Sequence, residues 1–404
     1  MIFFLLLAVF FLPDLFSYFG ISSSTAAGMM LAAGLSIFLC HIRPLSHRIT
    51  LDGGISFGVF AALMIIGIAF HFAIASIYGQ IDLVRGFTSM APLGMLIWGS
   101  AALARLLTKA GPTRVDKAVR SMFWILFVVA LLAIANPFPE LSRSEKSVFP
   151  FSEPSFFALA FTPILLFMCV TSRRARMLLW TSSLAIALVH ESLTLLVGCT
   201  LVAFICLRWR VLIPMLLTLS LVLPYIEKEY YTERIKLSEE NLSSLVYIQG
   251  WQLVIDAWKR TSGWGVGFQQ LGHEVPDTLP IRDLVQAVAE KDMNLLDGGF
   301  VAAKLLAEFG LVGALCISLY FWVAFRAILL LRRAAVRTRD LHNPLVLVAA
   351  SFITSFLIDL MVRGTGYFTA TALLTSASLY VFLGQVSCKN DTPKAVITLC
   401  SNNQ

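Results

Sequence analysis

Residues 177–207 read MLLWTSSLAIALVHESLTLLVGCTLVAFICL, a stretch whose only charged side chain is that of Glu191, next to His190. A membrane helix needs ~20 apolar residues, so this stretch is too long for one untilted helix. Basic residues flank it on both sides, and positively charged loops stay in the cytoplasm. We therefore predict two short membrane helices, joined by a tight external turn at residues 190–192.

The composition of the whole chain has the same character. Of its 404 residues, 58% are hydrophobic and only 14% are charged, and the mean hydropathy is +0.81. Soluble domains carry about 25% charged residues, and twelve membrane helices of ~20 residues would need ~240 apolar positions, close to the number present. These values exclude a soluble enzyme, a disordered chain and a nucleic-acid-binding protein. They predict an all-α, polytopic integral membrane protein.

Apolar runs divide the chain into about twelve predicted transmembrane helices. They cover residues 1–19, 21–40, 55–79, 86–108, 121–136, 155–171, 177–189, 192–207, 211–226, 301–325, 344–362 and 366–386. The first run lacks a basic leading segment and a small-residue cleavage site, so we expect a membrane helix there and not a removed signal peptide. Transmembrane helices 1–9 then occupy residues 1–226, and a large external loop with short helices occupies 227–300. Transmembrane helices 10–12 occupy 301–386, before a short cytoplasmic tail at 387–404.

The net charge of +7 indicates orientation in the membrane. Nineteen of the 31 Lys and Arg residues stand in short clusters after every second apolar run. The positive-inside rule gives this distribution to cytoplasmic loops, so both termini are predicted to be cytoplasmic and nucleic acid is not expected as a partner. The seven cysteines form no C-x-x-C pair and avoid the long external loop. Neither a disulfide framework nor a structural zinc site is therefore expected.

Two features mark the long loop. Apolar residues fall near one helical face of residues 241–260, which predicts an amphipathic helix lying on the membrane surface or packed against the bundle. Residues 263–268, GWGVGF, lack the strand–turn–helix unit that surrounds nucleotide-binding glycine motifs. These glycines instead allow the backbone to approach a ligand or a membrane helix closely.

Function is expected where costly polar groups are kept at the membrane boundary. The predicted external segments supply Asp82, Arg85, Arg143, Lys146, Glu153, His190, Glu191, Arg234, Lys236, Arg282, Asp297, Lys304, Glu308, Asp359 and Arg363. The histidines do not cluster, so no metal site is predicted.

Arg363, Glu153 and the pair His190–Glu191 have two interpretations each. Arg363 either pairs with Asp359 one helical turn earlier or directs its guanidinium at a phosphate. Glu153 either decorates a helix start, with Ser152 as the cap and Pro154 as the first helical residue, or serves as a base or a sugar-hydroxyl acceptor. His190 and Glu191 form either a capped turn or a proton-handling pair.

Four segments resemble bacterial oligosaccharide-repeat polymerases of the Wzy type, within the O-antigen ligase and polymerase superfamily. They are Ser152-Glu153-Pro154-Ser155 after a loop bearing Arg143; residues 243–251 (SSLVYIQGW) with 263–272 (GWGVGFQQLG); residues 294–300 (NLLDGGF) with Lys304 and residues 308–313 (EFGLVG); and residues 363–368 (RGTGYF). Each motif alone is moderately specific for the family. Together, in this order on a chain with many membrane spans and one large external loop late in the sequence, they are strongly specific. The resemblance covers roughly residues 140–370.

The resemblance implies an inverting, integral-membrane glycosyltransferase on the periplasmic face of the bacterial inner membrane. Such an enzyme transfers a growing glycan from undecaprenyl diphosphate to a sugar hydroxyl of a new undecaprenyl-diphosphate-linked repeat unit. It uses no cofactor, nucleotide sugar or metal. Its partners would be lipid-linked oligosaccharides, membrane lipid, a chain-length regulator and a flippase. The related ligases carry a histidine in the long loop where this chain has Asn294 to Asp297, which favours a polymerase.

This chemistry needs fixed cations for the leaving diphosphate and a carboxylate for the proton of the acceptor hydroxyl. We predict Glu153, Asp297, Arg363 and Arg143 as the catalytic residues. The residues predicted to bind diphosphate or substrate are Arg363, Arg85, Lys304, Arg282, His190, Glu191, Gly265, Gly267 and Tyr367.

Two other classes of protein fit the same sequence. The first is an O-antigen ligase or another capsule or exopolysaccharide transferase of the superfamily. The second is a lipid-glycan transporter or flippase, although the chain shows no internal repeat of the kind that many transporters have.

Overall fold

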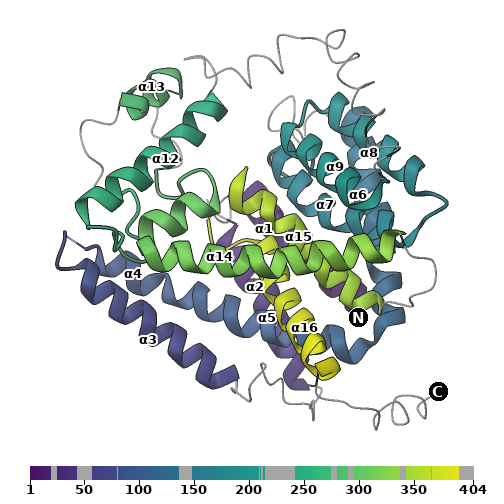
Figure 1. The fold of residues 1–404 in the computed structure, drawn as a ribbon, viewed down its shortest axis with the longest axis horizontal. Helices are drawn as coiled ribbons and strands as arrows, with labels where there is room; N and C mark the ends of the chain where they lie inside the picture. Colours follow the sequence, from purple (N-terminus) through teal and green to yellow (C-terminus); the bar gives the residue numbers. More distant parts are fainter. Residues whose placement is uncertain are drawn as a thin grey trace.

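In the computed structural model, α-helices joined by turns and short loops make up the described part of the chain (Figure 1). The described residues are 1–19, 25–42, 57–79, 81–135, 148–208, 210, 213, 242–273, 280–289, 295–336, 343–364 and 366–390. Among them no segment forms a β-strand, and Val148 and Phe151 make an isolated bridge. The prediction of an all-α fold is confirmed for these residues.

Apolar helices make up most of the bundle. The described helices are α1 (Ile2–Tyr18), α2 (Ala26–Ile42), α3 (Phe57–Ala75), α4 (Leu83–Thr88), α5 (Met90–Ala110), α6 (Pro112–Ala135), α7 (Pro154–Thr171), α8 (Arg176–Val189), α9 (Leu193–Cys206), α12 (Leu242–Arg260), α13 (Pro280–Ala289), α14 (Val301–Val336), α15 (Pro344–Met361) and α16 (Ala370–Asn390). Five helical segments, at 83–110, 112–135, 154–171, 301–336 and 344–361, are long and apolar enough to cross a membrane, and shorter apolar helices accompany them. The chain is therefore a membrane-embedded helical protein. The predicted span at 211–226 lies almost wholly outside the described residues.

Three of the predicted spans differ clearly from the helices that form there. The run at 86–108 is divided at Ser89 into α4 and α5, and Asp82 caps the start of α4 by accepting the Arg85 backbone N–H at 2.9 Å. α6 begins at Pro112, well before residue 121, since proline suits the first turn of a helix and long basic side chains reach past the apolar region. α14 continues to Val336, but its backbone is non-helical at Gly310 (φ 54°, ψ −128°).

The turn predicted at residues 190–192 is present. α8 ends at Val189 and α9 begins at Leu193. The Ser192 hydroxyl accepts the Leu195 backbone N–H at 3.3 Å, which caps α9. Between the two helices, Trp180 Nε1 donates to the Cys199 carbonyl at 2.9 Å. The long apolar stretch is thus a helical hairpin, as its length and its charged midpoint predicted.

Several basic residues meet at one end of the bundle. Arg120 on α6 donates to Ser172 Oγ at 3.0 Å, just after α7 ends. Arg176 donates to the carbonyls of Cys206 at 2.8 Å and Ala335 at 3.1 Å, in the last turns of α9 and α14. Carbonyls at helix C-termini lack intrahelical donors, so these guanidinium groups stabilise the ends of three helices. Clusters that the sequence assigned to separate cytoplasmic loops are therefore neighbours.

Helix α7 connects this basic end to the opposite one. All of its residues from Phe157 to Val170 are buried, and the aromatic rings of Phe157 and Phe161 stack with centroids 5.2 Å apart. Its 18 residues span about 27 Å at ~1.5 Å per residue, close to the ~30 Å hydrocarbon thickness of a bilayer. Glu153, at its N-terminus, therefore lies about one membrane thickness from Arg120.

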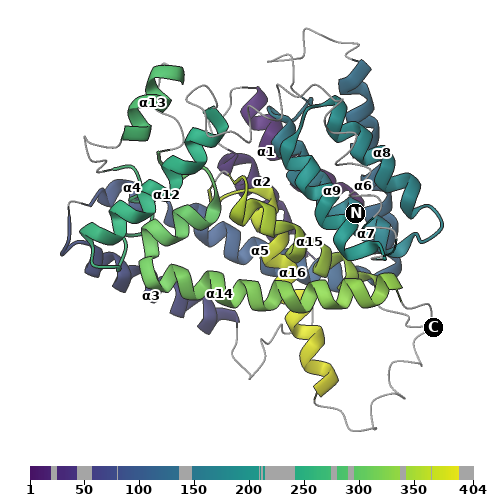
Figure 2. The ribbon, with the colours of Figure 1, turned by 45° about the horizontal axis from the view of Figure 1, so that its top comes forward.

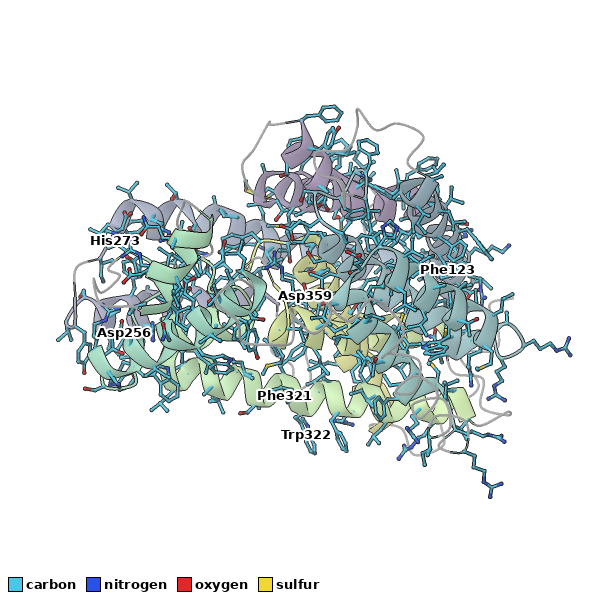
Figure 3. The ribbon with its side chains drawn as sticks, turned by 90° about the horizontal axis from the view of Figure 1, so that it is seen from above. Phe123, Asp256, His273, Phe321, Trp322 and Asp359 are labelled. Atoms are coloured by element: carbon cyan, nitrogen blue, oxygen red, sulfur yellow. The ribbon has the colours of Figure 1, made fainter. Side chains whose placement is uncertain are left out.

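The outer side of α14 carries a row of large exposed apolar side chains. Leu315, Leu319, Trp322 and Phe325 are 55–61% exposed and recur every three or four residues. Figure 3 shows Trp322 pointing away from the bundle, whereas Asp359 lies inside it. Since each such side chain would gain ~1.5–3 kcal/mol from burial, the row is suited to contact with lipid.

Candidate functional site

Helix α12 packs against the first part of α14 and against α13 (Figures 1 and 2). Its buried face includes Leu253, Val254 and Ala257, which join the cluster around Phe300 and Ala303 at the start of α14. An amphipathic helix over this region was predicted, and the structure shows it packed against the bundle.

The glycine-rich turn after α12 is bonded to the break in α14. The backbone N–H groups of Val266 and Gly267 donate to the carbonyls of Ala307 and Glu308, both at 2.9 Å. Leu311 N–H donates in turn to the Gly263 carbonyl at 2.9 Å. A helix interrupted at Gly310 loses intrahelical bonds, and this turn replaces them. The close approach predicted for the glycines is therefore an approach to a helix.

Replacing Gly265 with alanine is expected to destabilise the protein by about 2–4 kcal/mol. Gly265 has φ of 87°, and an added Cβ would lie 2.5 Å from the Glu308 carbonyl oxygen. The measurement is thermal unfolding of the purified protein in detergent. Gly67→Ala on α3 is the matched control, because its Cβ meets no atom within 4 Å. Equal melting temperatures for the two variants would show that the turn does not constrain α14.

A buried lysine lies next to this turn. Lys304 is 1% exposed, and its ammonium group donates to Asp297 Oδ1 at 2.7 Å and to the Leu296 carbonyl at 2.8 Å. It also lies 3.3 Å from Gln269 Oε1 and 5.1 Å from the centre of the Tyr367 ring. Burying an ammonium group is costly unless acceptors surround it, and these contacts provide them.

Glu308, one helical turn after Lys304, closes the cluster. It is 0% exposed, its Oε2 accepts the Tyr367 hydroxyl at 2.9 Å, and its Oε1 lies 3.9 Å from Lys304 Nζ. The Tyr367 phenol is the donor in this bond and supplies a hydrogen to the buried carboxylate. We call Asp297, Lys304, Glu308 and Tyr367 the buried cluster, after the buried ion pair of Lys304 and Glu308; Asp297 and Tyr367 are partly buried and form its outer side. The predicted site included three of them and omitted Glu308, although its i,i+4 spacing from Lys304 was visible in the sequence.

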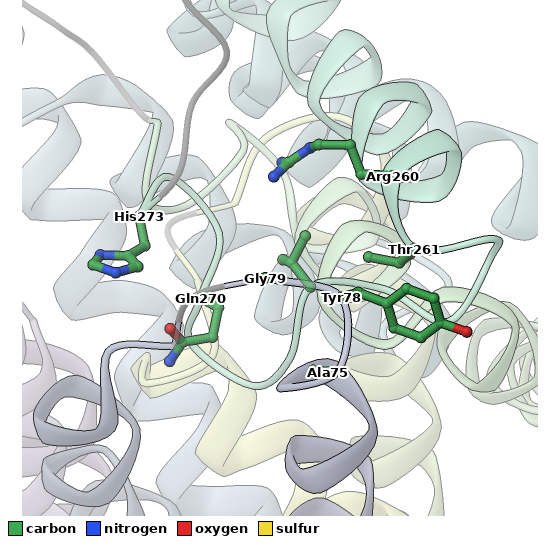
Figure 4. Close-up of a pocket in the computed structure, with 8 residues that line it drawn as sticks. Ala75, Tyr78, Gly79, Arg260, Thr261, Gln270 and His273 are labelled. Carbon is green, nitrogen blue, oxygen red and sulfur yellow. The ribbon is translucent and has the colours of Figure 1, made fainter.

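Arg85 joins this region from α4. Its Nη1 donates to the Leu271 carbonyl at 3.0 Å. The Gln270 side chain joins the same two segments, the glycine-rich turn and the start of α4, because its Oε1 accepts the Asp82 backbone N–H at 2.8 Å. Beside it opens a small pocket with a polar lining that includes Tyr78, Arg260, Thr261, Gln270 and His273 (Figure 4).

A second pair of charges lies near the surface. Arg363 Nη2 donates to Glu153 Oε2 at 2.8 Å across 210 residues of sequence. Arg363 does not pair with Asp359. Helix α15 ends at Met361, before Arg363, and Asp359 instead accepts the Thr371 hydroxyl at 2.7 Å.

The start of α7 also corrects a detail of the prediction. Pro154 is the first helical residue, as expected, but Glu153 and not Ser152 occupies the N-cap position. No side chain caps this helix, since Glu153 Oε2 accepts from Arg363 and from the Ser155 hydroxyl. The carboxylate is therefore held by an ion pair in place of a backbone N–H.

The loop after α15 connects the Arg363–Glu153 pair to the buried cluster. The Gly364 backbone N–H donates to the Gly299 carbonyl at 3.2 Å. A Cβ on Gly366 would lie 2.7 Å from Asp297 Oδ1, and a Cβ on Gly250 of α12 would touch the Gly298 carbonyl. Each of the four motif segments is thus in contact with at least one other. They meet at the end of the bundle opposite Arg120 and Arg176.

Other predicted site residues lie elsewhere. His190 Nε2 lies 3.1 Å from the Ala130 carbonyl on α6, and burial lowers its pKa below the usual value. Glu191 closes the α8–α9 turn with φ of 50°. Arg282 lies on α13, which packs on the side of α12 through Val285 and its neighbours. Arg143 lies outside the described residues.

Comparison with known proteins finds no matching family model, no matching curated protein and no matching solved structure. Within the described ranges, no group of three or more His, Cys, Asp and Glu residues is arranged to hold a metal ion. The site is therefore defined by its own geometry: the buried ion pair of Lys304 and Glu308, the partly exposed Asp297 held by Lys304, and the accessible Arg363–Glu153 pair.

Proposed function

We propose that the chain is an oligosaccharide-repeat polymerase of the Wzy type. It transfers a growing glycan from undecaprenyl diphosphate to a sugar hydroxyl of a new lipid-linked repeat unit, as an inverting glycosyltransferase. One observation carries the proposal: the four segments that resemble this family, separated by up to 210 residues, meet around Arg363, Glu153 and the buried cluster.

Exposure divides the roles among the charged groups. The side chains of Glu153, Asp297 and Arg363 are 48%, 40% and 24% exposed, so a substrate can reach them. The side chains of Lys304 and Glu308 are 2% and 0% exposed, which excludes direct contact with a bulky glycan. We therefore assign Arg363 to the diphosphate, Asp297 or Glu153 to the acceptor hydroxyl, and Lys304 with Glu308 to the positioning of Asp297.

The reaction then proceeds in one displacement. The acceptor hydroxyl oxygen attacks the anomeric carbon of the donor glycan, and the bond from that carbon to the diphosphate oxygen breaks. The hydroxyl proton passes to the carboxylate, and the bonding electron pair leaves with undecaprenyl diphosphate. Arg363 stabilises the charge that develops on this leaving group. Because Glu153 holds the guanidinium beforehand, arrival of the diphosphate also releases Glu153.

The proposal includes a topology: about twelve transmembrane helices, both termini cytoplasmic, and the buried cluster on the periplasmic side of a bacterial inner membrane. Cysteine labelling in spheroplasts tests it. A membrane-impermeant maleimide is expected to label His273→Cys in intact spheroplasts, and Arg174→Cys only after permeabilisation. Both residues are exposed and lie in turns at opposite ends of the bundle. The parent chain supplies the background, and labelling of Arg174→Cys from outside would contradict the orientation.

The gel pattern of a deletion strain separates the proposal from a ligase. Loss of a polymerase leaves the lipopolysaccharide core with one repeat unit, whereas loss of a ligase leaves bare core and strands the glycan on its lipid carrier. Full-length chain supplied on a plasmid should restore the ladder.

A transporter is favoured by one specific observation. Charges buried among helices, such as Lys304 and Glu308, also serve proton-coupled transport. A strain lacking a lipid-glycan transporter would place no repeat unit on the external face, so even the single-repeat band would be absent.

A further inference from the structure

A second pocket opens at the basic end of the bundle, between α1, α5 and α6. Its volume is about 400 Å³, within the ~300–1,000 Å³ range of ligand sites. Lys109, Arg114 and Lys117 line it together with apolar side chains that include Ile2, Phe3 and Leu106. The turn at Gly111, with φ of 82°, brings the end of α5 and the start of α6 into this arrangement.

Across the described ranges of the chain, no carboxylate pairs with these three cations. Among the described residues, none of them forms an ion pair or a hydrogen bond through its side chain. The nearest carboxylate in sequence, Asp116, is held by Arg120 at 2.9 Å. In the part of the chain that the structure describes, the pocket therefore presents three unpaired positive charges next to an apolar wall.

We propose that this pocket binds the phosphate headgroup of an anionic membrane lipid. A phosphate fits a pocket lined by three cations, and the apolar wall fits the acyl chains of the same molecule. The position agrees with this occupant, because the pocket lies at the end of the bundle where Arg120, Arg173 and Arg176 gather. The inference stands on this pocket alone and does not depend on the proposed glycan chemistry.

Native mass spectrometry of the full chain, titrated with phosphatidylglycerol or phosphatidylcholine in detergent, tests the proposal. The wild type should retain phosphatidylglycerol in preference to phosphatidylcholine. Lys109→Gln, Arg114→Gln and Lys117→Gln combined should weaken phosphatidylglycerol binding by about 100-fold, since each cation near a membrane surface contributes about fivefold. If the triple variant does not accumulate, Arg114→Gln alone should weaken binding by about fivefold.

A charge-matched control separates this pocket from general basicity. Arg174→Gln, Arg326→Gln and Arg333→Gln combined remove the same charge from exposed positions that do not line the pocket, and should leave lipid binding unchanged. Equal loss in both triple variants, or no loss in the first, would overturn the proposal. Complete displacement of the lipid by millimolar inorganic phosphate would also overturn it, because the site would then take free anions.

Discussion

Replacing Arg363 with alanine is expected to slow polymer formation by about 100- to 1,000-fold, the usual cost of losing one group that stabilises charge in a transition state. The guanidinium is accessible and lies in a loop that contacts both Glu153 and the segment around Gly299. Loss of its charge leaves the departing diphosphate without this cation. The measurement is the lipopolysaccharide ladder of a deletion strain carrying the variant, normalised to the amount of protein in the membrane.

Two variants control for this experiment. Arg363→Lys keeps the charge but loses the planar fork that matches a diphosphate, so it should retain part of the activity. Arg174→Ala removes an exposed arginine at the basic end and should leave the ladder intact. A normal ladder from Arg363→Ala at a normal protein level would rule out the assigned role.

Replacing Lys304 with methionine is expected to destabilise the protein by about 3–5 kcal/mol, because Glu308 would stay buried without its cation. Both side chains are almost completely buried, and Lys304 also holds Asp297 at 2.7 Å. Thermal unfolding in detergent would show the loss as a large fall in melting temperature or as failure to accumulate.

The double variant Lys304→Met with Glu308→Gln is the decisive comparison for the buried cluster. Removing both charges leaves no uncompensated ion, so much of the lost stability should return. Its glycan-transfer activity should remain low, since Asp297 has lost the ammonium group that positions it. Additive destabilisation by the two substitutions would show that Lys304 and Glu308 do not act as a pair.

Elements defined by local sequence were the most predictable. The α8–α9 hairpin followed from a stretch too long for one helix with a charge at its middle, and α12 followed from apolar residues at helical spacing. The break at Gly310 could not be predicted in this way. A glycine within an apolar helix is usually tolerated, and the break depends on hydrogen bonds from a turn more than 40 residues earlier.

The sequence predicted most residues of the candidate site, but it did not predict which of them form ion pairs with one another. Sequence identified Arg363, Glu153, Asp297, Lys304 and Tyr367 as ionisable or polar groups beside membrane helices. It offered Asp359 as the partner of Arg363, because helical spacing is the only geometry a sequence displays directly. The helix ends before Arg363, and the true partner comes from the other half of the chain.

Extension of a synthetic undecaprenyl-diphosphate repeat unit by the purified protein tests the central claim most directly. We expect a ladder of products that grows by one repeat unit at a time, that persists in the presence of a chelator, and that Arg363→Ala suppresses. A substrate that a known polymerase extends but this protein leaves unchanged would contradict the assignment as a polymerase.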